Sequence, residues 1–260
     1  AIYTKHAAVT DLPGLVDHHF FGIPEEEALR MDPMQRSCLR EGFRAVKAAR
    51  VSRETLRNSA TGVYVGSMNY DHVMSVEGLQ DSGNMPTMAS RLSQVLGLRG
   101  PSLFLDTGCS ASMVAADVAA CHLQRHRISL ALVLGANYLL NPDMFLARCA
   151  INLLSKQGRS MAFQRSADGY VVGEGCGAAV LGWSKSASSS SPRWRCSQVM
   201  QDGRSAQLTA PSGPAQQELL QEALRRAGSA AGEVVCVECQ ANGSQLGDPI
   251  ETGAIAKVHA

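Results

Sequence analysis

The chain has 260 residues, 45% of them hydrophobic and 18% charged, a balance typical of a globular protein with one large domain or two modest ones. Its formal net charge of +1 and its 5% aromatic content give no reason to expect nucleic acid or an anionic membrane as a partner. No apolar run reaches the roughly eighteen residues that a membrane-spanning helix needs, so we expect no membrane span.

Caps, turn residues and apolar periodicity predict alternating helices and strands through the first two thirds of the chain. Asp32 followed by Pro33 is an N-cap with proline at the first helical position, so we expect a helix from there to about Arg50. Residues 61–67 alternate and are rich in β-branched and aromatic side chains, which is typical of a strand. The other elements expected here are an aromatic-rich loop at 17–23, a long loop over 68–86, helices over 87–96, 111–125 and 144–151, and strands over 103–105 and 130–135.

The last third of the chain continues the alternation. Residues 169–183 are rich in glycine, which indicates close backbone approach, and a strand is expected at their end. Residues 184–192 are serine-rich and are expected to form a flexible surface loop. Strands over 195–200 and 233–238 and helices over 214–227 and from Asp248 complete an α/β pattern around a mainly buried sheet.

Eight cysteines are scattered along the chain, mostly inside apolar stretches. This distribution indicates reduced thiols in an intracellular protein rather than a disulfide framework. No secretory signal is visible, so the expected location is the cytoplasm, and the abrupt start leaves room for an upstream targeting segment.

Two cysteine and histidine patterns could suggest a metal, but neither predicts a site. Cys236 and Cys239 have C-x-x-C spacing, yet on the expected strand they would point to opposite faces, and no second pair is present. His122 and His126 lie four residues apart on an expected helix without a third ligand, and we interpret them as two solvated histidines. We therefore expect no metal.

Cys109 lies at an expected turn between a strand and a helix. Gly108 permits the tight turn, and small helix-forming residues follow from Ala111. A helix N-terminus favours the nucleophilic thiolate form of a cysteine. The alternative is that Cys109 is a small buried apolar residue, as most free cysteines are. The position alone leaves both interpretations open.

Five motifs in one order resemble the β-ketoacyl synthase (ketosynthase) domain of type I polyketide synthases and the related fatty-acid synthases. The resemblance covers the chain almost from end to end. The nucleophile motif of that family is usually D-T-A-C-S-S-S-L, and this chain has D-T-G-C-S-A-S-M over 106–113. The other matches are F-F-G-I at 20–23 with E-A-L-R-M-D-P-M-Q-R at 27–36, A-D-G-Y-V-V-G-E-G-C-G at 167–177, Q-D-G-R at 201–204 with L-T-A-P-S-G-P-A-Q-Q at 208–217, and L-G-D-P-I-E at 246–251.

The resemblance implies a thiolase-like, layered α/β fold with two related halves, normally a homodimer. The first half would occupy residues 1–183 and the second would begin at residue 194, with the serine-rich loop at 184–193 between them. The chain would be truncated at both ends: the family's first strand should precede residue 1, and the second half would be incomplete over 194–260 because the K-x-N-x-G-H motif should follow Ala260.

The resemblance also implies an acyltransferase of the 3-oxoacyl-carrier-protein synthase type. Cys109 would take an acyl group from the phosphopantetheine thioester of an acyl carrier protein, and a malonyl-type extender would then condense with loss of carbon dioxide. No cofactor would bind directly, since the carrier brings the phosphopantetheine.

One part of the site departs from the family. Where the family has E-A-H-G-T-G-T, this chain has E-C-Q-A-N-G-S over 238–244, so Gln240 occupies the position of the first active-site histidine. Asn242 and Ser244 align with the threonines that contact the phosphopantetheine arm, although either can be a simple turn residue. Tyr170 aligns with an aromatic residue of the acyl pocket, and core packing explains it equally well. His259 matches neither family histidine.

The departure leaves two hypotheses about activity. In the first, the domain loads acyl groups on Cys109 and condensation is impaired by Gln240. In the second, it is an inactive or non-elongating acyl-binding or dimer-scaffold domain. A cysteine hydrolase is rejected because no histidine lies in a recognisable partner motif.

Overall fold

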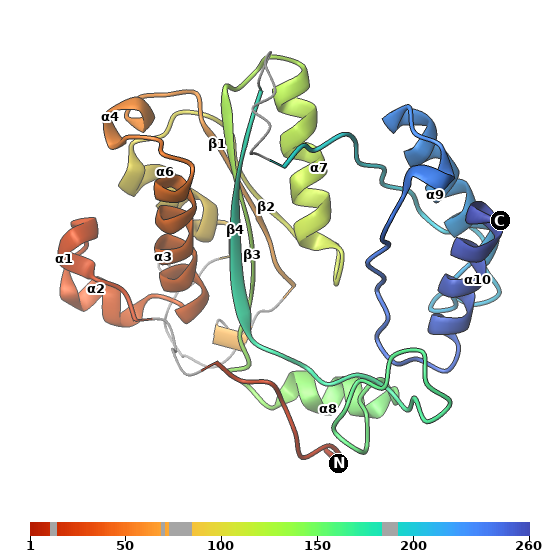
Figure 1. Cartoon of the computed structure of the whole chain (residues 1–260). Coiled ribbons are helices and arrows are strands. Elements are labelled where there is room, and N and C mark those ends of the chain that lie inside the picture. The colour runs from red at the N-terminus through yellow and green to blue at the C-terminus, as the bar shows by residue number, and fades with distance from the viewer. Residues whose placement is uncertain (11–14, 69–70, 73–84, 184–191) are drawn as a thin grey trace. The chain divides into compact units, whose positions relative to one another are not determined.

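The computed structural model of the protein describes residues 1–10, 15–68, 71–72, 85–183 and 192–260. The chain divides into two compact units, and each is described here by itself (Figure 1). The first, called the sheet unit, consists of Val9–Pro142 and Gly173–Ala187. The second, called the loop-and-helix unit, consists of Ala1–Ala8, Asp143–Val172 and Ser188–Ala260.

The sheet unit is built on four strands, which among the described residues have the order β2-β1-β3-β4. β1 (Gly62–Gly66) lies between β2 (Ser102–Leu105) and β3 (Leu130–Asn137) and is parallel to both. β4 (Gly175–Gly182) pairs antiparallel with β3. The carboxyl ends of the three parallel strands therefore meet at one edge of the sheet.

Helices cover both faces of this sheet (Figure 1). α3 (Pro33–Ala48) and α6 (Thr87–Leu96) lie on one face, and α7 (Ala111–Gln124) lies on the other. Because strand side chains alternate, Val63 and Val65 join the core under α3 and α6, while Tyr64 joins the core under α7. Burial on both faces explains the nearly continuous apolar runs of these strands.

Asp32 begins α3 as the sequence predicts. Its carboxylate accepts a hydrogen bond from the Met34 N–H at 2.7 Å, and Pro33 takes the first helical position. Burial raises the pKa of Asp32, and its Oδ2 has no hydrogen-bond partner among the described residues. The cap therefore stabilises the helix at the cost of burying a carboxyl group.

Shorter helices complete the two units. The sheet unit also holds α1 (His18–Phe21), α2 (Glu25–Arg30) and α4 (Arg53–Leu56). The loop-and-helix unit holds α8 (Asp143–Ala150), α9 (Gly213–Ala227), the 3₁₀ turn η1 (Ala231–Glu233) and α10 (Gly247–His259), and α9 packs against α10. Among the described residues, each helix is too short or too polar to span a lipid bilayer.

The structure confirms most of the predicted elements and corrects three. Residues 17–23 are not a plain loop, because the Asp17 side chain accepts from the Phe20 N–H and caps the short helix α1. The strands predicted at 195–200 and 233–238 are wrong: both segments lack strand pairing in the described residues, and Val235 is 99% exposed. β-branched residues suit a strand, but a strand forms only with a hydrogen-bonded neighbour. The loops predicted over 68–86 and 184–192 lie largely outside the described residues.

Candidate active site

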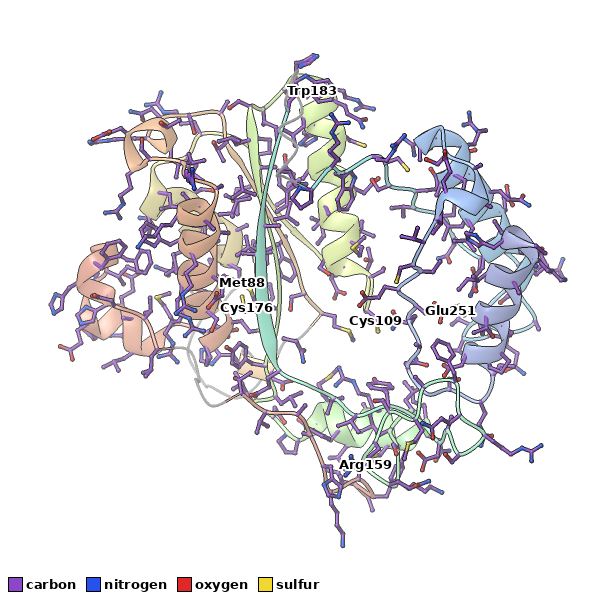
Figure 2. The ribbon with its side chains drawn as sticks, in the orientation of Figure 1. Met88, Cys109, Arg159, Cys176, Trp183 and Glu251 are labelled. Carbon is purple, nitrogen blue, oxygen red and sulfur yellow. The ribbon has the colours of Figure 1, made fainter. Side chains whose placement is uncertain are left out.

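Cys109 is exposed and lies two residues before α7, at the end of that helix seen in Figure 2. The turn before it is fixed by short-range hydrogen bonds: the Gly108 N–H donates to Asp106 Oδ1 at 2.9 Å, and the Ser110 hydroxyl donates to the Thr107 carbonyl at 3.0 Å. Gly108 has φ +66°, a left-handed conformation that glycine adopts without strain. The predicted strand–turn–helix geometry is present, and the alternative of a buried Cys109 is wrong.

One glycine in β1 and one in β3 let α7 approach the sheet closely. A Cβ on Gly66, the last residue of β1, would lie 2.4 Å from Ala111 C and Ser112 N. A Cβ on Gly135 in β3 would lie 2.9 Å from Ser112 Cβ. Only glycine fits at these positions, so the backbone of the sheet sets where α7 begins and where Cys109 lies.

The face of α7 against the sheet consists of small side chains. Alanine dominates this face, and its buried members are Ala111, Ala115, Ala116, Ala119 and Ala120. Small side chains shorten the distance between helix and sheet and lose little entropy when buried. The helix that begins beside Cys109 is thus held by contact along its length.

Gln240 lies on a loop that is bound to α10 by a carboxylate. Glu251 Oε1 accepts from the Gln240 N–H at 2.7 Å, and its Oε2 accepts from the Ala241 N–H at 3.0 Å. Ala241 has φ +43°, which is rare for a residue with a side chain. The two bonds from Glu251, labelled on α10 in Figure 2, hold this conformation at the position next to Gln240.

A second carboxylate of α10 holds the rest of the loop. Asp248 is buried, with 4% of its surface exposed, and its two oxygens accept from the Ser244 N–H at 3.1 Å and the Phe163 N–H at 2.9 Å. Phe163 has φ +60° and is more than half exposed. Asp248 does not act as the N-cap of α10, since that position is Leu246, which forms no side-chain cap. Asp248 therefore binds the loop rather than capping its own helix.

Tyr170 lies on a segment that is bound to the Gln240 loop. Gly169, directly before it, donates its N–H to the Gly243 carbonyl at 3.0 Å, and a Cβ on Gly243 would lie 2.8 Å from the Gly169 carbonyl oxygen. The Tyr170 N–H bonds to the Leu153 carbonyl at 3.1 Å. Nearby, the Ser155 hydroxyl lowers the pKa of Asp168 by a hydrogen bond of 2.5 Å. These bonds fix the backbone on both sides of the tyrosine.

The structure thus brings four of the five candidate residues together in one unit. Gln240, Asn242 and Ser244 share one loop, and Tyr170 follows a residue bonded to that loop. Cys109 belongs to the sheet unit. The clamp formed by Asp248 and Glu251 was not assigned from the sequence, although their spacing of three residues places both on one helix face.

Two other predictions concern side chains outside this set. His122 is not a solvated histidine: it is half-buried, and its Nδ1 lies 2.7 Å from the hydroxyl of the fully buried Tyr64. Burial raises the pKa of Tyr64 to about 12. Burial also raises the pKa of the Cys239 thiol, which disfavours the thiolate that metals bind. Among the described residues no group of three or more potential metal ligands occurs.

Comparison with protein families identifies the chain. The β-ketoacyl synthase N-terminal domain matches residues 1–187, and the β-ketoacyl synthase C-terminal domain matches residues 194–260. The chain belongs to the β-ketoacyl synthase family. The sequence motifs therefore indicated the correct family. The proteins with which the chain is compared below are members of that family.

The similar curated proteins include polyketide synthases. The chain is 40% identical over 265 residues to polyketide synthase GfsB of Streptomyces halstedii, covering 97% of this chain and 5% of that protein. It is 40% identical over 264 residues to mycoketide-CoA synthase of Mycobacterium tuberculosis, covering 98% of this chain and 6% of that protein. The chain thus spans only a small part of these relatives.

Solved ketosynthases share the fold. The ketosynthase from module 6 of the bacillaene synthase of Bacillus subtilis superposes with a TM-score of 0.90 at 34% identity, covering 99% of this chain and 45% of that chain. The oxazolomycin ketosynthase domain OzmH KS7 of Streptomyces albus superposes with a TM-score of 0.87 at 30% identity, covering 96% of this chain and 46% of that chain. The predicted α/β, thiolase-like fold is confirmed.

Proposed function

We propose that this ketosynthase domain transfers an acyl group from a carrier-protein thioester to Cys109. The Cys109 thiolate attacks the thioester carbonyl and forms a new carbon–sulfur bond, the carbon–sulfur bond to phosphopantetheine breaks, and the phosphopantetheine thiolate leaves and takes a proton from solvent. The observation that carries the proposal is the exposed Cys109 at a turn whose position is set by α7 and by its close contact with Gly66 and Gly135. A fixed nucleophile avoids the cost of ordering it during reaction.

The second step of the proposed reaction is decarboxylative condensation. A malonyl-type extender loses carbon dioxide, and its carbanion attacks the acyl carbonyl on Cys109, which releases the thiolate and leaves a β-keto thioester on the carrier. Negative charge develops on the extender's thioester oxygen, where the family places histidine and this chain places Gln240. An amide can donate a hydrogen bond but carries no positive charge.

The substitution affects the two steps unequally. Acyl transfer depends mainly on Cys109 and backbone donors near it, whereas condensation depends on the residue at position 240. Removing one oxyanion donor costs roughly 10²–10³ in rate, and Gln240 retains part of that capacity. We therefore propose that loading is better preserved than condensation.

Asn242, Ser244 and Tyr170 are proposed to bind the phosphopantetheine arm and the acyl chain. Support comes from the clamp of Asp248 and Glu251, which fixes the loop backbone before any ligand arrives. Asn242 and Ser244 keep hydrogen-bonding side chains where the family has threonines. The carrier supplies the phosphopantetheine, so the domain itself needs no cofactor.

The domain organisation is proposed from the same family membership. Residues 1–183 would form the first half, 184–193 a connecting loop, and 194–260 the beginning of the second half, and two copies would form a homodimer. The family matches at 1–187 and 194–260 support this division. Size-exclusion chromatography with light scattering on the full-length protein measures the dimer directly.

A second candidate function is an inactive or non-elongating acyl-binding or scaffold domain. Gln240 at the histidine position favours it. Iodoacetamide at pH 7 distinguishes the two candidates: selective labelling of Cys109 supports an activated nucleophile, and labelling no faster than at the other seven cysteines supports the scaffold.

A single-turnover assay of the full-length protein tests condensation. Acyl-loaded protein is mixed with a malonyl-type carrier thioester, and β-keto product and carbon dioxide are measured for the natural protein and for Gln240→His. We expect slow condensation that Gln240→His accelerates, with loading unchanged. Equal condensation by both proteins would show that position 240 does not limit the reaction.

A further inference from the structure

We propose that α1 and α3 form a docking site for an acidic polypeptide segment that inserts one bulky apolar side chain. The site is a pocket of about 360 Å³ in the sheet unit, here called the aromatic pocket. Its aromatic and basic lining consists of Phe20, Phe21, Phe43, Arg40, Arg44 and Lys47. The proposal is independent of the chemistry at Cys109.

The apolar part of the pocket is made by three phenylalanines that pack edge to face. The ring centroids of Phe20 and Phe43 are 4.9 Å apart, and those of Phe20 and Phe21 are 5.0 Å apart. Phe20 nevertheless remains 43% exposed, so apolar surface stays open to solvent. Filling a concave apolar surface of this size with a partner's side chain removes apolar area from water, which favours binding.

The charged side chains that line the pocket are mainly basic, with Arg40, Arg44 and Lys47 against one acidic residue, Asp17, and the segment that contains them is basic as well. Residues 30–57 contain eight basic and three acidic residues, whereas all other residues together contain sixteen basic and twenty acidic ones. The small net charge of the chain therefore conceals a strongly basic segment. A partner complementary to this segment is acidic.

The basic side chains are concentrated on one helix face. Arg36, Arg40, Arg44 and Lys47 follow one another at spacings of four, four and three residues along α3. Arg53 adds a further cation, with its guanidinium carbon 4.7 Å from the centre of the Phe20 ring. Among the described residues neither Lys47 nor Arg53 takes part in an ion pair.

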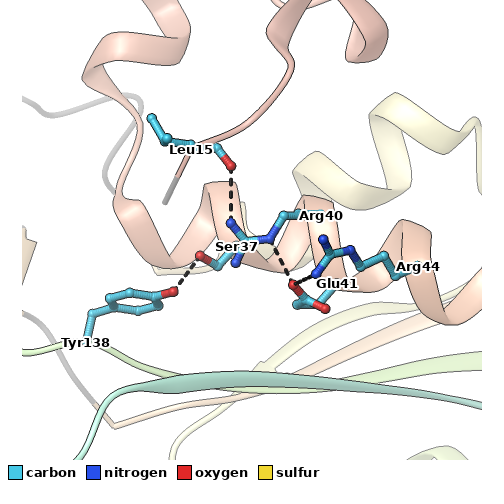
Figure 3. A network of polar contacts seen from close by, with 6 residues as sticks. All are labelled: Leu15, Ser37, Arg40, Glu41, Arg44 and Tyr138. Carbon is cyan, nitrogen blue, oxygen red and sulfur yellow. Dashed lines mark hydrogen bonds and ion pairs between the residues drawn. The ribbon is translucent and has the colours of Figure 1, made fainter. Parts of the chain in front are cut away.

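Hydrogen bonds already orient part of the basic rim of the pocket, which consists of Arg40, Arg44 and Lys47 (Figure 3). Glu41 accepts from Arg40 Nε at 2.8 Å and from Arg44 Nη1 at 2.9 Å, and Arg40 also donates to the Leu15 carbonyl at 3.3 Å. One carboxylate thus fixes two guanidinium groups and leaves excess positive charge. A rim that is ordered before binding loses less entropy when a partner docks.

The shape of the site favours a polypeptide over a nucleic acid or a membrane. Edge-to-face packing and the guanidinium of Arg53 occupy the faces of the rings, so bases have no free platform on which to stack. A membrane surface is bound by apolar side chains that protrude, whereas this pocket needs a side chain that enters it. An acidic helix or strand with one large apolar residue meets both requirements.

Fluorescence anisotropy with synthetic peptides tests the proposal on the complete protein. The probe is a short fluorescein-labelled amphipathic peptide of glutamate, alanine and leucine with one tryptophan, and matched peptides carry glutamine or lysine in place of glutamate. We expect the glutamate peptide to bind most tightly and added salt to weaken it. Arg44→Glu with Lys47→Glu should weaken it by about tenfold or more.

Control variants separate docking from folding and from net charge. Arg193→Glu with Arg204→Glu reverses two exposed charges in the loop-and-helix unit and should leave affinity unchanged. Phe20→Ala should weaken binding while thermal melting shows a folded protein. Equal affinity for the lysine peptide, or no loss in the Arg44→Glu, Lys47→Glu protein, would overturn the proposal. So would binding of phosphatidylserine vesicles or an oligodeoxynucleotide without peptide binding.

Discussion

Gly66→Ala should disturb the position of Cys109 without changing any residue near its sulfur. The added Cβ would lie 2.4 Å from Ala111 C and Ser112 N, whereas carbon atoms in contact prefer about 3.5–4.0 Å. The start of α7 must therefore recede by roughly 1 Å. Overpacking against rigid backbone costs about 1–3 kcal/mol, and a nucleophile displaced by about 1 Å can lose about 10² in rate.

Two measurements on the full-length protein check this prediction. Thermal unfolding should show a lower Tm, by about 2–4 °C for each kcal/mol lost in a chain of this size. Acyl transfer to Cys109 from a carrier thioester should be slower by more than the loss of folded protein explains. Gly177→Ala in β4 is the matched control, because a Cβ there meets nothing within 4 Å. If Gly66→Ala melts and loads like the control, the sheet does not set the position of α7.

Three further substitutions test other contacts of the two units. Glu251→Ala removes the acceptor of two backbone hydrogen bonds at the Gln240 loop. The single-turnover rate of condensation should therefore fall by more than the loss of folded protein, followed by thermal melting, explains. A rate loss that matches the loss of folded protein would indicate a purely structural role. Tyr64→Phe removes the hydroxyl bonded to His122 and should lower the free energy of unfolding in urea by about 1 kcal/mol, and no change would show that this bond contributes nothing. Asp32→Ala should lower the free energy of unfolding by about 0.5–2 kcal/mol because the helix cap is lost, whereas Asp32→Asn keeps a hydrogen-bond acceptor. Because burial raises the pKa of Asp32, the folded state binds its proton more tightly than the unfolded state does. The natural protein should therefore lose stability relative to Asp32→Asn as pH rises from about 4 through the folded-state pKa, measured by urea unfolding between pH 4 and 7; a gap that is constant with pH would contradict this.

Local sequence signals predicted the sheet unit well because each of its elements carries its own determinants. Asp32 and Pro33 mark the start of α3, and the apolar run before Gly108 marks β2. The site around Cys109 follows from the same signals, since a turn between a strand and a helix is a local feature. The short distance between α7 and the sheet was not predictable, because it depends on contact between Gly66 and residues far away in the sequence.

Predictions failed where structure depends on a partner. Residues 233–238 have strand-forming side chains, but strand formation needs a neighbour that composition does not reveal. The role of Glu251 was not predicted for a similar reason: it accepts hydrogen bonds from backbone N–H groups about ten residues earlier, and backbone groups leave no sequence pattern. The pairing of His122 with Tyr64 joins a helix to a strand 58 residues away. Such contacts emerge only from the folded chain.

The identity of the cysteine that carries the acyl group tests the central claim most directly. The full-length protein is incubated with an acyl-carrier thioester and digested, and mass spectrometry assigns the acyl mass among the eight cysteines, with Cys109→Ala as the control. We predict stoichiometric acylation at Cys109 and none in the Cys109→Ala protein. Absence of an adduct on Cys109, or an equal adduct on another cysteine, would contradict the proposed function.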